Sequence, residues 1–270
     1  MSDVFLSPLT LIGVGASFAF STVFYQNYQQ KILEIHQLKE IPSFQVGEHL
    51  QKILNASPEK RLHYVAVEGV VQPVGEPLVS QFVPRCYGVV QKVTTQEHWK
   101  VLNYLGSWVS KTMNGKESSR TVPFQLVQQG SYLDRVMVKV ESPLEAKGDY
   151  LEQVHRRFRK AEDGLLETVV QTVSGEKLTA REEREELLRV GTVLTGFGEV
   201  VLERDGAMRL QPPRDGRSFI LLPGDHRSFI RRHENTAGMW KGLTALFSIT
   251  GSTLLAAFVY SAVNNDNRRR

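Results

Sequence analysis

Two long runs of apolar and small residues lie near the ends of the chain. The first is Val4–Tyr25 and the second is Leu243–Val263, and neither contains a charged residue. At a rise of 1.5 Å per residue, a helix of either length spans the roughly 30 Å of a bilayer's hydrocarbon core. Trp240 and Lys241 precede the second run and Tyr260 lies near its far end, where interfacial anchors are common. The pattern predicts membrane-spanning helices at both places.

Each run also has another interpretation. The first could be a cleaved secretory signal or a matrix-targeting presequence, both of which carry basic residues near their start. Here Asp3 precedes the run and the first 30 residues contain no Lys or Arg, which argues against both. The second resembles a buried helix of a soluble protein, although so long a charge-free run seldom occurs in a soluble core. We therefore expect two spans, a domain at 26–238 between them, and a short tail at 264–270.

The flanking charges predict the orientation. Two spans place both termini on one side of the membrane and the middle domain on the other. The positive-inside rule counts basic residues in short flanks, and the tail ends in Arg268, Arg269 and Arg270. The tail is therefore predicted to be cytosolic, and the domain to face a lumen or an intermembrane space.

The pattern between the two runs changes from helical to alternating. A helix is expected to continue past residue 26 until Pro42 stops it, and Val46–Leu54 has the periodicity of a second, short helix. The predicted fold class is α+β, with two transmembrane helices flanking a β-rich domain. Strands are predicted at His63–Val74, Cys86–Trp99, Thr121–Val127 and Asp134–Ser142, with turns at Gly75–Pro77 and Asn114–Lys116.

A further helix is predicted after Thr179. Thr179 and Glu182 have the spacing of a capping box, and Gly191 is placed to end the helix in the left-handed conformation. The acidic run Glu182, Glu183, Glu185 and Glu186 would then lie in its first turns and face solvent, where the helix dipole favours it. A metal or catalytic role for these carboxylates is the alternative.

The stretch TGFGEVVLERDGAMRLQPP, Thr195–Pro213, opens with Gly-x-Gly, as phosphate-binding loops do. A dinucleotide fingerprint requires a helix directly after the glycines, whereas EVVLE favours a strand. Asp205-Gly206 is typical of a tight hairpin turn. Gly196 and Gly198 would share one face of a strand and leave a flat strip for close packing. The stretch is interpreted as a hairpin, not as a nucleotide site.

Composition narrows the chemistry further. The net charge of +4 is not concentrated with aromatics in one stretch, so nucleic acid is not expected as a partner. Cys86 is the only cysteine, and this excludes an internal disulfide or a zinc site with two thiolates. The seven histidines are scattered without an HExxH motif, and no Gly-x-Ser-x-Gly occurs. We predict no catalytic, cofactor-binding or metal-binding residue in this chain.

Several motifs resemble a known family. VGTVLTGFGEVVLERDGAMRLQPP, followed by SFILL and a Trp-led span, is similar to a family of organelle-membrane E3 ubiquitin ligases, the mitochondrial ubiquitin ligase activator of NF-κB family. VGEHLQKIL, YVAVEGVV, SQFVPRCYGVVQKVTTQEH, TVPFQLV and SGEKL match as well. The resemblance implies a GIDE or BAM domain in the intermembrane space, two spans in the mitochondrial outer membrane, and partners from the ubiquitin pathway and among mitochondrial substrates. Peroxisomes are an alternative address.

The chain departs from that family at its end. The family carries a cytosolic RING finger, which binds zinc through Cys and His in two tetrahedral sites. Residues 264–270 contain neither Cys nor His. Whether the chain is an enzyme therefore stays open. We expect either a ligase-family protein contributing the membrane anchor and partner-binding domain, or an inert adaptor that pairs with a full-length ligase. Gly251 and Ser252 would allow such pairing, or homo-oligomers, through the membrane helices.

Two basic clusters suggest lipid contact. One is His155–Lys160, and the other precedes the second span. Basic residues beside a membrane attract anionic headgroups by about 1 kcal/mol each. Arg227, Arg231 and Arg232 are the predicted lipid-contacting residues, with ordinary solvated charge as the alternative. A third function class, a soluble luminal enzyme released from its signal, would lose about 20 residues from its N-terminus.

Overall fold

The computed structural model describes residues 8–102, 104, 106–130, 136–160 and 176–269. The chain divides into two compact units. One contains Met1–Ile41 together with Arg227–Arg270, and the other is Pro42–His226. The first unit is helical and the second is built mainly from strands.

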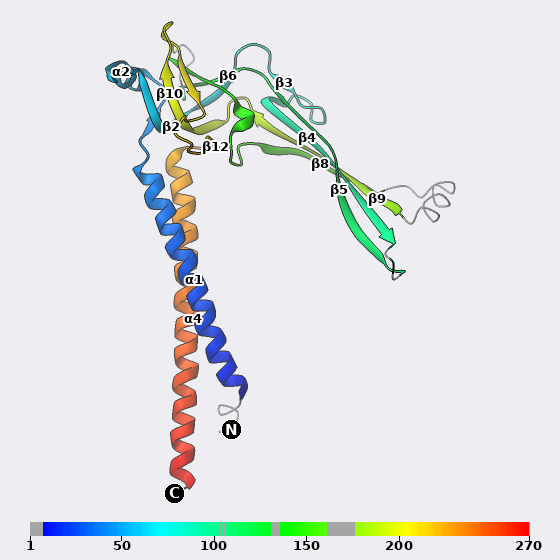
Figure 1. Cartoon of the computed structure of the whole chain (residues 1–270), viewed down its shortest axis with the longest axis vertical. Helices are drawn as coiled ribbons and strands as arrows, with labels where there is room; N and C mark the ends of the chain where they lie inside the picture. Colours follow the sequence, from blue (N-terminus) through cyan, green and yellow to red (C-terminus); the bar gives the residue numbers. More distant parts are fainter. Residues whose placement is uncertain (1–7, 103, 105, 131–135, 161–175, 270) are drawn as a thin grey trace. The chain divides into compact units, whose positions relative to one another are not determined.

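The helical unit consists of two long helices, α1 (Pro8–Glu40) and α4 (His226–Arg269), which lie side by side (Figure 1). Small and aromatic residues form their contact. The hydroxyls of Ser21 and Ser248 are 2.7 Å apart, and the ring centroids of Phe24 and Trp240 are 5.7 Å apart. The helix after residue 26 and its end before Pro42 are confirmed, since α1 is continuous to Glu40.

One helix of the described residues is long and apolar enough to cross a membrane. It lies within α4, at His226–Asn264, with a mean hydropathy of 1.7 in its most apolar part and 6% of that part buried. The predicted second span is therefore a membrane-capable helix. Of the predicted first span, residues 4–7 lie outside the described residues and residues 8–25 are helical. That α1 crosses a membrane stays a prediction.

The second unit contains a seven-stranded sheet in the order β1-β2-β6-β7-β11-β10-β12. Because β2 also pairs with β10, five of its strands close into a barrel-like ring. The short helix predicted at 46–54 is present as α2 (Glu48–Ala56), whose Leu50 and Leu54 are buried. The strands are β1 (Ser43–Gln45), β2 (Arg61–Pro73), β6 (Phe124–Val127), β7 (Met137–Val140), β10 (Val193–Leu202), β11 (Met208–Gln211) and β12 (Ile220–Pro223).

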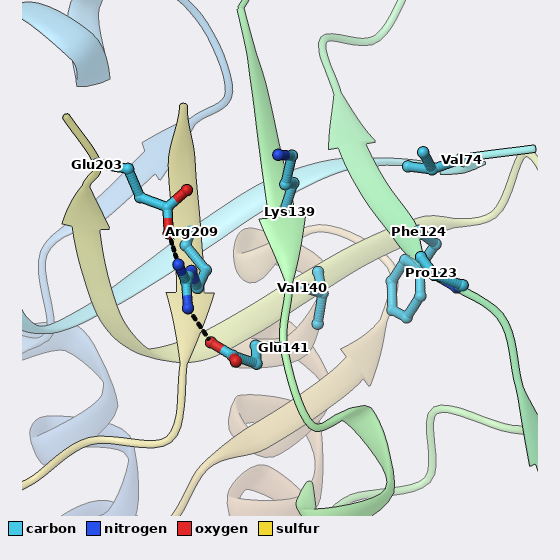
Figure 2. Close-up of a pocket in the computed structure, with 8 residues that line it drawn as sticks. All are labelled: Val74, Pro123, Phe124, Lys139, Val140, Glu141, Glu203 and Arg209. Atoms are coloured by element: carbon cyan, nitrogen blue, oxygen red, sulfur yellow. Dashed lines mark hydrogen bonds and ion pairs between the residues drawn. The ribbon is translucent and has the colours of Figure 1, made fainter. Parts of the chain in front are cut away.

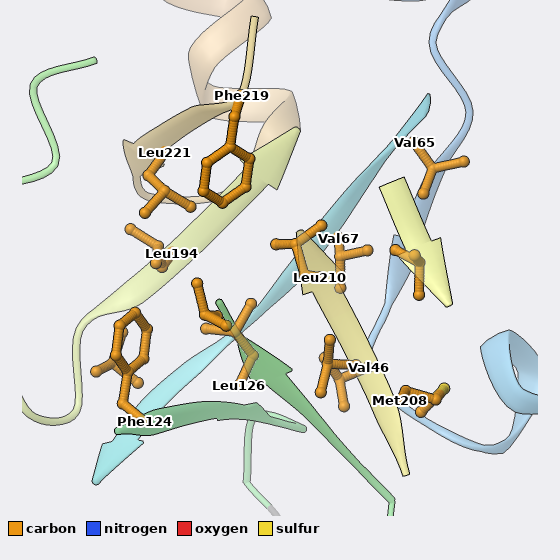
Figure 3. Close-up of a cluster of buried hydrophobic side chains, with 14 of the residues drawn as sticks. Val46, Val65, Val67, Phe124, Leu126, Leu194, Met208, Leu210, Phe219 and Leu221 are labelled. Atoms are coloured by element: carbon orange, nitrogen blue, oxygen red, sulfur yellow. The ribbon is translucent and has the colours of Figure 1, made fainter. Parts of the chain in front are cut away.

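The hydrophobic core lies inside this ring (Figure 3). Alternate residues of each strand point inward, as the two-residue period of a strand requires, and α2 adds two leucines. The largest fully buried apolar side chains of this unit are Leu50, Leu54, Phe124, Leu126, Leu187, Leu188, Leu194, Phe197, Met208, Leu210 and Leu221.

A second sheet extends from the barrel. β4 lies within it, pairing with β5 on one side and β9 on the other, and β8 pairs with β9. Only the end of this sheet nearest the barrel contributes to the core, through Val89, Val90 and Leu188. Its elements are β3 (Leu78–Val79), β4 (Tyr87–Leu102), β5 (Trp108–Thr121), β8 (Glu152–Lys160) and β9 (Glu176–Arg189), and a 3-10 turn, Pro143–Glu145, precedes β8.

The structure confirms the predicted hairpin and its glycines. β10 and β11 pair antiparallel around the Asp205-Gly206 turn, where Gly206 has a φ of 84°. A Cβ atom at Gly196 would lie 2.4 Å from Leu210 Cδ2, and one at Gly198 would lie 2.7 Å from the carbonyl oxygen of Gln211. The two glycines therefore allow neighbouring strands to pack closely, and no helix follows them.

The helix predicted after Thr179 is wrong, because residues 176–189 form strand β9. The capping box would have satisfied a few backbone groups at one helix end. The sheet pairs the segment with β4 and β8 along most of its length. The turn predicted at Asn114–Lys116 is also wrong, since these residues continue β5 and a bulge near Thr95 absorbs the irregularity.

Candidate functional site

The basic residues predicted to contact lipid lie in the first turns of α4. Arg227, Arg231 and Arg232 are exposed, and none has an ion pair with another described residue. At 1.5 Å per residue, Arg232 is about 12 Å and Arg227 about 20 Å along the helix from Trp240. The arginines therefore precede Trp240 by about two to four helical turns.

The same part of the helical unit carries ion pairs between α1 and α4. Lys39 Nζ lies 2.7 Å from a carboxylate oxygen of Glu234, and His233 Nδ1 lies 3.7 Å from one of Glu34. The charged halves of the two helices are thus adjacent, and so are their apolar halves, where Ser21 meets Ser248. This separation of charge from apolar surface along the helix pair is what a membrane boundary requires.

A pocket of about 370 Å³ opens on the barrel-like sheet (Figure 2). Its lining is partly apolar, through Val74, Pro123, Phe124 and Val140, and partly charged, through Lys139, Glu141, Glu203 and Arg209. The Arg209 guanidinium binds the carboxylate of Glu141 at 2.8 Å and also pairs with Glu203. Arg209 is therefore already paired with two carboxylates, whereas Lys139, the other cation that lines the pocket, has no ion pair with another described residue.

A buried carboxylate holds the loop that leads into β4. Glu185 of β9 is completely buried and accepts a hydrogen bond of 2.6 Å from the Ser80 hydroxyl and another of 2.6 Å from Gln91 Nε2. The backbone N–H groups of Gln81 and Phe82 also donate to it, at 2.9 and 3.3 Å. Burial acts to raise the pKa of Glu185, but the four donors outweigh it and the pKa lies below its ordinary value.

Glu182, two strand positions away from Arg184 and close to β8, belongs to a second charged network. Its carboxylate accepts a 2.6 Å hydrogen bond from Arg156 Nε, and Arg184 and His98 lie within 3.5 Å. The hydrogen bond from Arg156 is the main reason that the pKa of Glu182 is lowered. The Glu182 carboxylate of β9 therefore connects to β8 through Arg156 and to β4 through His98.

These contacts correct the expectation of a solvated acidic face. Glu182 and Glu185 are buried, whereas Glu183 and Glu186 are half-buried. Three or more His, Cys, Asp or Glu side chains that could hold a metal ion do not come together in the described residues. EEREELL consists of five charged residues followed by two leucines, so it lacks the alternation of apolar and polar residues that would have indicated a strand.

The other residues considered for chemistry are separate from one another. Cys86 is buried and free, at the start of β4. His155 stacks on Phe82, with ring centroids 4.5 Å apart. The cluster His155–Lys160 forms most of β8, so its side chains alternate between the two faces of the sheet.

Comparison with known proteins places the chain in a family. The family model described as GIDE, E3 Ubiquitin ligase, matches residues 91–256. The zebrafish Mitochondrial ubiquitin ligase activator of nfkb 1-A is 38% identical over 92% of this chain and 72% of its own length. The human Mitochondrial ubiquitin ligase activator of NFKB 1 is 35% identical over 87% of this chain and 66% of its own length. The Drosophila melanogaster Mitochondrial E3 ubiquitin protein ligase 1 is 28% identical over 86% and 66%.

The chain thus spans about two thirds to three quarters of the length of these relatives. No solved structure matches it. The match begins within β4, includes the barrel strands β6, β7, β10 and β11, and ends in the apolar part of α4, whereas the barrel strand β2 precedes it. The chain belongs to the GIDE family of E3 ubiquitin ligases.

Proposed function

We propose that this chain is the membrane-anchoring and partner-binding part of a mitochondrial outer-membrane E3 ubiquitin ligase system. The observation that carries the proposal is the family match, which runs from residue 91, within β4, to residue 256, within the membrane-capable helix α4. A conjugation machinery held at a membrane needs an anchor and a surface that selects partners. The membrane-capable helix α4 supports the anchoring part, and we assign the selection of partners to the Pro42–His226 unit.

The proposal includes a second span through α1. Its apolar half packs on that of α4: the Ser21 hydroxyl also donates to the Thr244 carbonyl at 3.2 Å, and Phe24 lies 5.3 Å from Phe247 between ring centroids. Hydrogen bonds between helices of this kind are favoured where water is absent. With both helices across the membrane, the two termini are cytosolic and Pro42–His226 faces the intermembrane space. Peroxisomes remain the alternative address.

The experiment for this proposal uses the 270-residue chain in isolated mitochondria and in a purified ubiquitination reaction. We expect alkaline carbonate to leave the chain in the membrane pellet, and protease added outside intact mitochondria to spare residues 42–226. With E1, E2 and ubiquitin alone, the chain is expected to form no conjugates. Conjugates from the purified chain would contradict the anchoring role, and release by carbonate would contradict membrane integration.

The adaptor alternative depends on membrane-helix pairing with a full-length ligase. The structure uses Gly251 within the chain: a Cβ atom there would lie 3.3 Å from Phe18 and from Ser17 of α1. Ser252 is exposed, and its hydroxyl donates to the Ser248 carbonyl of its own helix. The surface of α4 at Gly251 is therefore already covered by α1 and is not free to pack against another protein. Homo-oligomers through the helices stay a prediction.

The lipid role of Arg227, Arg231 and Arg232 is also proposed. Screening limits the attraction to a length of about 8 Å, so Arg231 and Arg232, which lie nearest Trp240, should contribute more of it than Arg227. We expect the triple change to Gln to lower cardiolipin retention by the full chain purified in mild detergent, measured as bound lipid per protein. A change of Arg204 and Arg214 to Gln, which removes two charges from the β unit, is the control. Equal retention by wild type and the triple variant would assign the arginines to ordinary solvated charge.

A further inference from the structure

The far end of the β4–β5 hairpin is the feature that the anchoring function does not explain. The two strands pair from Val90 and Thr121 to Leu102 and Trp108, and the chain turns back near Gly106, whose φ is 73°. Figure 1 shows β4, β5 and β9 as long strands that extend beyond the barrel strands of the same unit. The residues of this sheet that enter the described hydrophobic core are all at the opposite end. The far end is thus not required to fill that core.

Large apolar side chains gather at this far end and are exposed to solvent. The exposed fractions are 42% for Leu102, 97% for Tyr104, 49% for Trp108 and 51% for Val109. Leu102 pairs with Trp108 across the hairpin, so these residues come together at its tip. Scattered apolar residues are ordinary on a protein surface, but a group of them in one place marks a site of interaction. We call residues 102, 104, 108 and 109 the apolar tip.

Basic residues lie directly behind the apolar tip. Lys100 and Lys111 are each two or three positions from it, on β4 and β5, and both are exposed. Neither has an ion pair with another described residue. Arg159 and Lys160 end β8 at the same end of the sheet, where they pair in register with Arg181 and Ala180 of β9. The nearby carboxylate of Glu97 is already paired with Arg181 at 2.7 Å.

The apolar tip contains two aromatic residues, Tyr104 and Trp108, and the lysines lie behind it; apolar, aromatic and basic residues in one place are typical of a lipid interface. Apolar side chains lie in the acyl region, Trp and Tyr favour the headgroup boundary, and Lys attracts anionic headgroups. Proteins that rest on a bilayer bury such residues to a depth of about 5–10 Å, which the end of one hairpin can reach. The free lysines favour an anionic surface over a neutral one.

We propose that the apolar tip inserts into the interface of a bilayer that contains anionic lipid. This would give the Pro42–His226 unit its own membrane contact, in addition to the anchor supplied by α4. The inference goes beyond the proposed function, since it requires neither a ubiquitin partner nor a second span through α1. Its failure would also leave the carbonate result unchanged, because that result depends on the helices.

The test places a fluorophore that responds to its environment on the tip of the full chain. In a Cys86→Ser background, Tyr104→Cys is labelled with nitrobenzoxadiazole, and Ser119→Cys gives the matched control. Ser119 is also exposed on β5, but it pairs with Lys92 nearer the barrel. Each chain is reconstituted into nanodiscs of phosphatidylcholine, with and without phosphatidylserine, and protein-free vesicles of the same lipid are then added. The added vesicles cover the case in which the tip contacts an opposing membrane.

We expect the label at residue 104 to brighten and shift to shorter wavelength with phosphatidylserine, and the label at 119 to stay unchanged. Lys100→Gln with Lys111→Gln should lower the equilibrium constant for insertion about thirtyfold. Trp108→Ser should lower it about tenfold or more. These residues are exposed, so circular dichroism should show an unchanged fold.

Three results would overturn the proposal. One is a label at 104 that stays in water in the nanodiscs and after vesicle addition. A second is an equal response in neutral and anionic lipid, which would contradict the proposed attraction of Lys100 and Lys111 to anionic headgroups. The third is brightening in detergent that depends on protein concentration, which would assign the apolar tip to contacts between copies of the chain.

Discussion

Glu185→Ala is expected to destabilise the β unit by about 3–5 kcal/mol. The change removes the acceptor for the Ser80 hydroxyl, the Gln91 amide and the backbone N–H of Gln81. Each buried donor left without a partner costs about 1–3 kcal/mol, and water has little access because Glu185 and Gln91 are almost fully buried. The loop that enters β4 should lose its fixed conformation.

The measurement is urea unfolding of the full chain in mild detergent, monitored by the circular dichroism signal of its strands. Glu183→Ala is the matched control, since Glu183 is two residues away on β9, is half-buried and has no ion pair with another described residue. Its cost should stay within about 0.5 kcal/mol. Glu185→Gln should lie between the two, because an amide keeps one acceptor but presents a donor to Phe82 N–H. We call the buried Glu185 carboxylate and its four hydrogen-bond donors the Glu185 clamp. An equal loss of stability in Glu183→Ala and Glu185→Ala would contradict its proposed role.

The same clamp predicts a pH dependence with a definite sign. The pKa of Glu185 is lower in the folded protein than the unfolded value of about 4.3. Its contribution is therefore fully present above about pH 4.3 and is lost as the pH falls through the lower folded value. The stability difference between wild type and Glu185→Ala should shrink on acidification. Other carboxylates titrate in both proteins, so the difference isolates Glu185.

The parts that the sequence predicted are those in which local pattern and tertiary structure agree. The apolar run at 243–263, the stop at Pro42 and the Asp205-Gly206 turn each depend on chemistry within a few residues. Strand β9 failed for the opposite reason. Its local capping spacing favours a helix, but β4 and β8 supply pairing and arginine partners from far along the chain.

The candidate sites were harder to predict than the fold. The arginines of α4 could be singled out because their charges precede an apolar run, and their contact with lipid stays a prediction. The Glu185 clamp joins residues about a hundred positions apart, so no sequence spacing could indicate it. The apolar tip was missed as well, because the segment around Leu102–Val109 carries the same residues that a buried strand would. Only the exposure of Tyr104 and Trp108 in the folded chain separates the two cases.

The sequence pattern predicted a strand at Gly196-x-Gly198 but did not predict that the next residue, Glu199, forms a buried ion pair with Arg61. Glu199 lies at a bulge between β10 and β2 and is 1% exposed. Arg61 Nε lies 2.9 Å from a carboxylate oxygen of Glu199, but its N–H does not point at that oxygen, so the contact is an ion pair without a hydrogen bond. The backbone N–H of Arg214 donates to the other carboxylate oxygen at 3.3 Å. The pair joins the start of β2 to the middle of β10.

Arg61→Ala is therefore expected to cost about 3–5 kcal/mol, because it leaves the Glu199 carboxylate buried without its counter-charge. The same urea titration measures it. Arg209→Ala is the control, because Arg209 also pairs with two carboxylates but is about one third exposed, so its loss should cost about 1 kcal/mol or less.

The double variant Arg61→Ala with Glu199→Leu separates the two explanations of such a loss, because position 61 is truncated in both the single and the double variant. If the cost of Arg61→Ala comes from the stranded carboxylate, removing both charges should recover most of the stability, since apolar replacements for a buried pair are often neutral or better. If it comes from lost packing of the Arg61 stem, the double variant should be no more stable than Arg61→Ala. Recovery would mean that this ion pair holds β2 and β10 in register at a bulge without adding net stability.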